Sequence, residues 1–361
     1  MGQAPAGESY NHRGEGLPLI AGAGDFRDDR IVPSKFTTKP SKVSWAGDIV
    51  LSIRASIGAK VLADGEYCLG RGVASLRPGP KLDRAYLWHW LSHSERALAA
   101  KGRGATFLQV NRNDIGEMPI GLPPLDEQRR IAAILDQADA LRAKRRQVLT
   151  HLDDLGPGIF RHMFGHPVTN DRNWPLKRLA DLGTLDRGVS KHRPRNDPAL
   201  LGGAHPLIQT GDVANSGGYI SKFHATYSDL GLAQSRMWPA GTLCITIAAN
   251  IAKTGILTFD ACFPDSVVGF TSSRESTTFV QAWLGFLQAT LEASAPQSAQ
   301  KNINLAILRE LKVPVPSGDR VKEFHERICA VKEHRASTNR GQAALDAMFT
   351  SLQSHAFRGE L

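Results

Sequence analysis

At 361 residues the chain is long enough for two domains of ordinary size with a connecting structure. The hydrophobic share of 42% and the charged share of 22% are typical of a globular protein and argue against disorder. No apolar stretch approaches the roughly 20 residues that a membrane helix needs, and the first residues show no signal-peptide pattern. The net charge of +9 favours an anionic partner but does not identify it.

The four cysteines, Cys68, Cys244, Cys262 and Cys329, lie far apart and form no C-x-x-C pair. This spacing argues against a disulfide framework and against a thiolate zinc site. We therefore expect free, buried thiols, as in a protein of the reducing cytoplasm.

An internal repeat runs through the chain. Residues 46–53 match residues 240–247 without a gap, 194 positions further on. Shorter matches follow in the same order: Pro18-Leu19-Ile20 with Pro206-Leu207-Ile208, Gly24-Asp25 with Gly211-Asp212, Trp90-Leu91 with Trp283-Leu284, and Asn111-Arg112-Asn113 with Asn302-Ile303-Asn304. The common order and nearly constant offset indicate a tandem duplication.

Each copy is expected to be a mixed α/β domain. The matched octet follows a glycine turn and is rich in β-branched residues, which predicts a buried strand. Residues 86–98 and 279–291 have the apolar spacing of short amphipathic helices, and the Gly, Pro, Ser and Asn residues between predict loops and short strands. The second copy opens at Trp174, 32 residues before Pro206, whereas only 17 residues precede Pro18. The first copy is therefore predicted to lack its opening strand.

A long helix is predicted after each copy, beyond the boundaries Leu122-Pro123-Pro124 and Val313-Pro314-Val315-Pro316. With Asp126 as the expected N-cap, apolar residues recur in alternating steps of three and four. They occupy positions 131, 134, 138, 141, 148, 152 and 155, and Arg145 is the exception. The second helix shows the same spacing through Val321, Phe324, Ile328 and Val331, and again through Leu345, Phe349 and Leu352. The two seams predict an antiparallel pair, and Gly156-Pro157-Gly158 predicts a break or kink in the first helix.

Four segments resemble the specificity subunit (HsdS) of type I restriction-modification systems. The most specific is Leu122-Pro123-Pro124-Leu125-Asp126-Glu127-Gln128-Arg129-Arg130-Ile131-Ala132-Ala133-Ile134-Leu135. The others are Met1-Gly2-Gln3-Ala4-Pro5-Ala6-Gly7-Glu8-Ser9-Tyr10-Asn11, Gln300-Lys301-Asn302-Ile303-Asn304 and His355-Ala356-Phe357-Arg358-Gly359-Glu360-Leu361. The resemblance extends over nearly the whole chain.

The resemblance implies an α+β fold in which two similar mixed α/β target-recognition domains are separated by two long antiparallel helices, a coiled coil. The expected segments are a first recognition domain at 1–122, a central spacer at 123–165, a second recognition domain at 166–316 and a C-terminal spacer at 317–361. The chain would be a non-catalytic, cytoplasmic, bacterial DNA-binding subunit that reads a bipartite target and directs adenine methylation and cleavage. The implied partners are double-stranded DNA, two methyltransferase (modification) subunits and the restriction/translocase subunits. S-adenosylmethionine, ATP and Mg²⁺ would be held by those subunits, and no membrane is involved.

The predicted helix could set the distance between two half-sites. Residues 126–155 would span about 45 Å as a helix, and one turn of B-DNA is about 34–36 Å. We therefore expect that a longer helix would lengthen the spacer between the half-sites.

Polar loops supply the candidate DNA contacts. Arg and Lys suit guanine, and Asn and Gln suit adenine, because each offers matching hydrogen bonds in the major groove. The candidates are Arg54, Lys60, Lys101, Arg103, Arg112, Lys191, Arg193, Arg195, Asn250, Lys253, Gln300 and Lys301. Solvated loop charges are the alternative, and Asn113, Asn302 and Asn304 could instead cap turns or helices.

Catalytic motifs are missing from the sequence. It contains no amino-methyltransferase motif, no P-loop and no H-E-x-x-H, and the nuclease-like residues Pro264-Asp265 and Glu310-Leu311-Lys312 are best explained by chance. Two alternatives stay open: a non-catalytic two-domain protein-binding adaptor, and an enzyme with an unrecognised DNA-cleaving site.

Overall fold

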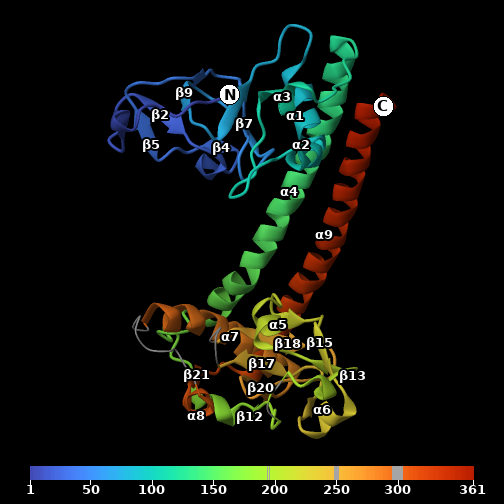
Figure 1. Cartoon of the computed structure of the whole chain (residues 1–361). Helices are drawn as coiled ribbons and strands as arrows, with labels where there is room; N and C mark the ends of the chain where they lie inside the picture. The colour runs from blue at the N-terminus through green and yellow to red at the C-terminus, as the bar shows by residue number, and fades with distance from the viewer. Residues whose placement is uncertain (193, 195, 248–251, 295–303) are drawn as a thin grey trace. The chain divides into compact units, whose positions relative to one another are not determined.

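The computed structural model describes residues 1–192, 194, 196–247, 252–294 and 304–361. The chain forms two compact units: unit 1 comprises residues 1–147 and 339–361, and unit 2 comprises residues 148–338 (Figure 1). Each unit combines helices with small sheets, and each includes part of both long helices.

Unit 1 contains a five-stranded sheet of order β1-β5-β2-β9-β6, a three-stranded sheet of order β10-β7-β8 and the hairpin β3-β4. The strands are β1 Tyr10–Asn11, β2 Leu17–Ile20, β3 Phe26–Arg27, β4 Arg30–Ile31, β5 Lys35–Thr37, β6 Val43–Ser44, β7 Ile49–Ser52, β8 Lys60–Leu62, β9 Tyr67–Leu69 and β10 Val73–Leu76. The short helices are η1 Gly7–Ser9, η2 Ala23–Asp25, α1 Arg84–His93, α2 Glu95–Ala100 and α3 Arg112–Gly116.

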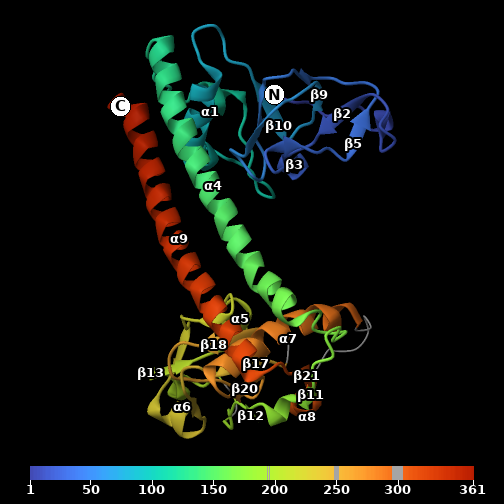
Figure 2. The same ribbon diagram turned by 180° about the vertical axis from the view of Figure 1, so that it is seen from behind.

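Unit 2 contains sheets of order β12-β20-β17-β18-β14, β15-β13-β19-β16 and β11-β21. The strands are β11 Leu176–Arg178, β12 Thr184–Arg187, β13 Leu201–Leu207, β14 Tyr219–Ile220, β15 Ala225–Tyr227, β16 Met237–Trp238, β17 Leu243–Thr246, β18 Thr254–Leu257, β19 Ala261–Cys262, β20 Val267–Thr271 and β21 Lys312–Pro314. The short helices are η3 Leu179–Asp181, η4 Pro198–Leu200, α5 Thr210–Ala214, α6 Asp229–Ala233, α7 Arg274–Ser294 and α8 Leu305–Glu310. Figure 2 shows α7 and α9 beside β17 and β20, where the largest core of the unit forms.

The internal repeat reappears in the strand pairing. Ile49 of β7 pairs with Leu62, and its equivalent Leu243 of β17 pairs with Ile256. On the other side Ser52 pairs with Val73, and Thr246 pairs with Val267. The buried strands expected at the matched octets are therefore confirmed, and they occupy the same place in both units.

The described part of the first copy begins at a position equivalent to one inside the second copy. The Gly2 N–H donates to Val73 O at 2.9 Å, and Gly188 N–H donates to Val267 O at the same distance. These glycines are thus equivalent, and β12, which directly precedes Gly188, pairs with β20. Among the described residues no strand pairs with the outer edge of β10.

The long helices α4 (Leu125–Phe164) and α9 (Gly318–Arg358) run antiparallel within each unit. In unit 1, Arg130 donates to Leu361 O at 2.8 Å and Arg142 Nε lies 2.6 Å from Asp346 Oδ1. In unit 2, Arg335 Nε lies 2.6 Å from Asp153 Oδ1, and the Phe160 and Phe324 rings meet at 5.6 Å. In each unit, residue numbers increase along α4 in the direction in which they decrease along α9. The predicted antiparallel pairing is therefore confirmed.

The seam predicted on α4 was partly wrong. Leu141, Val148 and Leu155 are 53%, 43% and 44% exposed, although the pattern placed them in the contact. In unit 1 Arg142 faces α9 instead, with its guanidinium 4.3 Å from the centroid of the Phe349 ring. Steps of three and four fit two neighbouring rows of a helix equally well, so the spacing could not choose between them.

The predicted ends and break of α4 also differ from the structure. The helix begins at Leu125, so Asp126 lies in its first turn and is not the N-cap. Gly156-Pro157-Gly158 does not break the helix, which continues through Pro157. Gly156 lies beside α9, where a Cβ would make an ordinary van der Waals contact of 3.8 Å with Ile328 Cδ1.

Of the four free cysteines, Cys68, Cys244 and Cys262 are buried as expected, whereas Cys329 is partly exposed. Among the described helices none has the length and apolar character to cross a bilayer.

Candidate nucleic-acid interface

The residues at the end of the central strand of each unit make equivalent backbone hydrogen bonds with the residues that precede the next strand. In unit 1 Ser52 N–H donates to Ala59 O at 2.7 Å, and Gly58 N–H donates to Ser52 O at 3.1 Å. In unit 2 Thr246 N–H donates to Lys253 O at 3.0 Å, and Ala252 N–H donates to Thr246 O at 2.9 Å. Gly58 and Ala252 both have a positive φ, of 99° and 57°, at equivalent places. The tip of the turn that these bonds close in unit 1 carries Arg54.

A second loop of unit 1 is bound to this turn. Arg103 and Gln109 exchange both of their backbone hydrogen bonds, at 3.0 and 2.9 Å. Ala55 N–H donates to Leu108 O at 3.0 Å, and Val110 N–H donates to Ile53 O at the same distance. Residues 103–109 and the turn at Arg54 therefore form one continuous surface.

This surface, which we call the Arg54 surface, consists of Arg54, Arg103, Phe107 and Leu108. The Arg54 guanidinium lies 5.3 Å from the centroid of the Phe107 ring. Phe107 is 54% exposed and Leu108 is 49% exposed, although both are large and apolar. Arginine beside an exposed aromatic ring is a combination that can contact phosphates and stack on bases.

The structure separates two predicted lysines from this surface. Lys60 Nζ donates to Ser92 Oγ at 2.6 Å and lies 4.6 Å from the centroid of the Trp88 ring. Burial lowers the pKa of Lys60, while nearby carboxylates act in the opposite direction. Lys101 is partly buried at the C-terminal end of α2. Arg112 is exposed, and it is the first residue of α3.

The predicted contacts of unit 2 are only partly described. Arg193, Arg195, Asn250, Gln300 and Lys301 lie outside the described residues. Lys191 has an exposed side chain, and its backbone N–H donates to Gln234 Oε1 at 2.6 Å. Lys253 is partly buried and lines a cavity of about 520 Å³.

The alternative role of the asparagines as helix caps applies to two equivalent residues. Asn111 Oδ1 accepts the N–H groups of Asn113 and Asp114 at the start of α3. Asn304 Oδ1 accepts the N–H of Ile307 at the start of α8. Asn304 therefore corresponds to Asn111 and not to Asn113, so the sequence match at this point was out of register by two residues. Asn302 lies outside the described residues.

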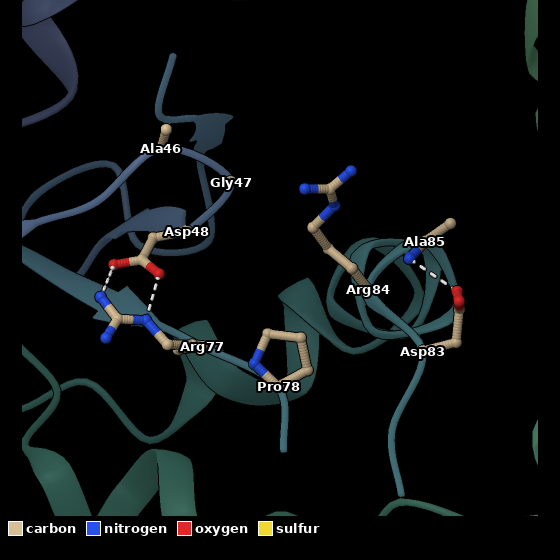
Figure 3. Close-up of a pocket in the computed structure, with 8 residues that line it drawn as sticks. All are labelled: Ala46, Gly47, Asp48, Arg77, Pro78, Asp83, Arg84 and Ala85. Carbon is tan, nitrogen blue, oxygen red and sulfur yellow. Dashed lines mark hydrogen bonds and ion pairs between the residues drawn. The ribbon is translucent and has the colours of Figure 1, made fainter. Parts of the chain in front are cut away.

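A pocket of about 380 Å³ lies beside the Gly47 turn of unit 1, between that turn and the start of α1 (Figure 3). On one side the buried Asp48 carboxylate accepts two hydrogen bonds from Arg77, at 2.7 and 2.8 Å. Burial by itself would raise the pKa of Asp48, but hydrogen bonds from Arg77, Ser75 and the Trp45 N–H outweigh it and lower that pKa. On the other side lies Arg84, and no carboxylate of the described residues pairs with it.

Sequence reasoning overlooked Phe107, Leu108 and Arg84. The first two are large apolar residues between Gly104 and Gln109 in a loop rich in polar residues, and that contrast could have identified them. Arg84 had no such signal, because it follows a helix cap and looks like an ordinary solvated helix residue.

Comparison with known proteins places both copies in one family. The model described as "Type I restriction modification DNA specificity domain" matches residues 11–151 and again residues 171–328. The EcoBI type I restriction enzyme specificity subunit of Escherichia coli is 21% identical over 398 residues, which cover 98% of this chain and 81% of that protein.

A Methanocaldococcus jannaschii protein, named as a candidate specificity subunit of the type I restriction enzyme MjaX, is 36% identical over 148 residues. That match covers 41% of this chain and 35% of the relative, so the chain spans about a third of its length. A solved chain from "Structural basis underlying complex assembly and conformational transition of the type I R-M system" has the same fold. Its TM-score is 0.60 at 17% identity, and the match covers 99% of this chain and 100% of that chain.

Proposed function

Because this chain belongs to the type I restriction-modification DNA specificity family, we propose that it is the subunit that chooses the DNA target for partner enzymes. Each unit would read one half of a bipartite sequence. The observation that carries this proposal is the duplication: both copies match the family model, share the same strand pairing, and make the same backbone hydrogen bonds after the central strand. Two equivalent reading heads suit a target in two parts.

The Arg54 surface is our candidate for DNA contact in unit 1. Phosphate contacts give affinity that falls with salt, whereas contacts with base edges give specificity. Arg54 and Arg103 could contact either, and Arg84 in the Gly47 pocket is a further candidate for a phosphate. The remaining predicted contacts, including those outside the described residues, stay predictions.

Partner subunits would dock on the long helices. In unit 1, Leu141 and Met348 are 53% and 45% exposed; in unit 2, Val148 and Leu155 are 43% and 44% exposed. Exposed apolar residues on a long helix are typical of a helix that packs against another protein. We propose that two methyltransferase subunits bind there, that restriction/translocase subunits join for cleavage, and that S-adenosylmethionine, ATP and Mg²⁺ act on those subunits.

Single-molecule sequencing of methylated bases, in cells with and without this gene, tests the proposal. We expect one split sequence, methylated at adenine, to lose its methylation when the gene is deleted and to regain it on complementation. An unchanged pattern of methylation would overturn the proposal and favour a protein-binding adaptor.

A further inference from the structure

A second cavity of about 320 Å³ in unit 2 contains a group of reactive side chains that DNA recognition does not use. It lies among the first part of α9, the start of α7 and the neighbouring strands β14 and β18. The residues that matter here are Tyr219, Arg274, Thr277, His325, Cys329 and Lys332.

His325 is oriented by Thr278 toward the thiol of Cys329. The Thr278 hydroxyl donates to Arg274 O at 2.9 Å, so its single hydrogen is already used. The His325 Nδ1–H therefore donates to Thr278 Oγ1, at 2.8 Å. The neutral ring then has its lone pair on Nε2, which lies 3.5 Å from Cys329 Sγ. An imidazole in this position can accept the thiol proton.

Two basic side chains, Lys332 and Arg274, line the cavity beside Cys329. Lys332 is one helical turn beyond Cys329, and its Nζ lies 3.3 Å from the centroid of the Tyr219 ring. Burial lowers the pKa of Lys332, and the charge of Cys329 acts in the opposite direction. Arg274 adds a second cation to the cavity wall. Positive neighbours stabilise a thiolate, which is the nucleophilic form of cysteine.

A buried hydroxyl group indicates that the cavity suits a ligand with an oxygen acceptor. Thr277 is 2% exposed, and its Oγ1 has no hydrogen-bond partner among the described residues. It lines the same cavity as Cys329. Because unpartnered buried hydroxyls are unfavourable, an oxygen bound in the cavity would be stabilised by this donor.

We propose that Cys329 is a nucleophilic thiol, that His325 is its base, and that the cavity is an oxidation site for small peroxides. His325 takes the thiol proton, and the sulfur attacks one peroxide oxygen. An S–O bond forms as the O–O bond breaks, so the sulfur is oxidised by two electrons and the peroxide is reduced. The departing hydroxide takes the proton back from His325 and leaves as water, and Cys329 becomes a sulfenic acid. This inference does not rest on the proposed DNA function.

The other cysteines provide an internal control. Cys68, Cys244 and Cys262 are buried, and burial strongly raises the pKa of the Cys244 thiol. In the folded chain, oxidation should therefore be confined to Cys329.

The test is to expose the folded, full-length chain to hydrogen peroxide with a sulfenic-acid trap, and to measure the modified peptides by mass spectrometry over time. We expect Cys329 to be modified first and His325→Gln to slow its reaction at least about tenfold, since a positioned base commonly contributes more than this. The matched control is His334→Gln on the exposed face of α9, which should leave the rate unchanged. Thr278→Val should slow the reaction because it frees the ring, and Thr278→Ser should restore it.

Circular dichroism before each reaction separates loss of reactivity from loss of folding. The proposal is overturned if the folded wild-type chain reacts at Cys329 no faster than the urea-unfolded chain. It is also overturned if the folded His325→Gln variant reacts as fast as wild type.

Discussion

The side chain of Gln128, near the start of α4, is buried and makes three hydrogen bonds to backbone groups of unit 1. It is 1% exposed, and its Nε2 donates to Lys81 O at 3.0 Å and to Pro123 O at 2.8 Å. Its Oε1 accepts the N–H of Asp83, the N-cap residue of α1, at 2.8 Å. Gln128 thus joins the start of α4 to the segment that leads into α1 of unit 1.

Replacing Gln128 by leucine should be strongly destabilising, because three backbone groups would lose their partner in a buried place. We expect a loss of about 2–4 kcal/mol in the free energy of unfolding, measured by urea denaturation. Gln137→Leu, at an exposed position of the same helix, is the matched control and should change little. Equal effects of the two substitutions would contradict this role of Gln128.

Arg54 should act mainly through phosphate or base contact if the Arg54 surface meets DNA. Arg54→Ala is expected to weaken binding and to reduce the slope of log affinity against log salt by about one, the value for one phosphate contact. Fluorescence anisotropy of a labelled duplex across salt concentrations measures that slope. Arg54→Lys should keep most of it, and Arg129→Ala on α4 should leave it unchanged. If Arg54→Ala leaves the slope of log affinity against log salt unchanged, Arg54 makes no phosphate contact, and the proposed role of the turn in DNA binding is wrong.

At the scale of elements, the unpaired edge of β10 is the clearest difference between the two copies. In unit 2 the equivalent edge is covered by β12, and its Leu185 is 3% exposed in the core. Joining a second copy of residues 174–187 directly ahead of Gly2 should supply the strand that β10 lacks. Burial of one leucine contributes about 1.5–3 kcal/mol, so the amides of residues 73–77 should exchange more slowly with deuterium.

The matched control for this fusion carries aspartate in place of the leucine equivalent to Leu185. A charged group at a buried position should prevent docking, so the control should leave exchange at β10 unchanged. Equal protection by both fusions, or by neither, would mean that the edge does not accept a strand in this way.

The sequence predicted the elements that depend on patterns of neighbouring residues, and it did not predict those that depend on contacts between distant segments. The central strands β7 and β17 were predicted because the octets match without a gap and are rich in β-branched residues. The face of α4 that contacts α9 was not predicted correctly. Arg142 makes this contact with its long side chain, which packs on the Phe349 ring, and a search for apolar residues does not find such a contact. At the candidate site, Arg54 and Arg103 were selected by residue type, but the backbone bonds Ala55–Leu108 and Val110–Ile53, which bring their loops together, have no signal in the sequence. Lys60 was selected in the same way, yet it points to α1.

At the scale of the whole molecule, the proposed function makes the two long helices a spacer. Inserting seven residues into α4 after Gln147 and seven into α9 after Thr338 would add about 10 Å, at 1.5 Å per residue. Since one DNA turn of about 34–36 Å holds about 10 base pairs, the spacer should grow by about three base pairs. Methylome sequencing should then report the same two half-sites, further apart.

An insertion into α4 alone supplies the comparison. With extra residues in one helix only, the pairs Arg142–Asp346 and Asp153–Arg335 could not both form, so methylation should be lost rather than shifted. If the paired insertion leaves the spacing as it was, the helices do not set it.

The ends of the two long helices have a consequence for biosynthesis. Phe160, near the end of α4, contacts Phe279 and Phe286 of unit 2, and Phe357, near the end of α9, contacts Tyr86 and His93 of unit 1 in the equivalent way. Unit 2 is continuous along the chain, whereas unit 1 needs residues 339–361 to complete its core. Unit 1 therefore leaves the ribosome first but finishes folding last, and a chain that stops before residue 339 would have a complete unit 2 and an incomplete unit 1.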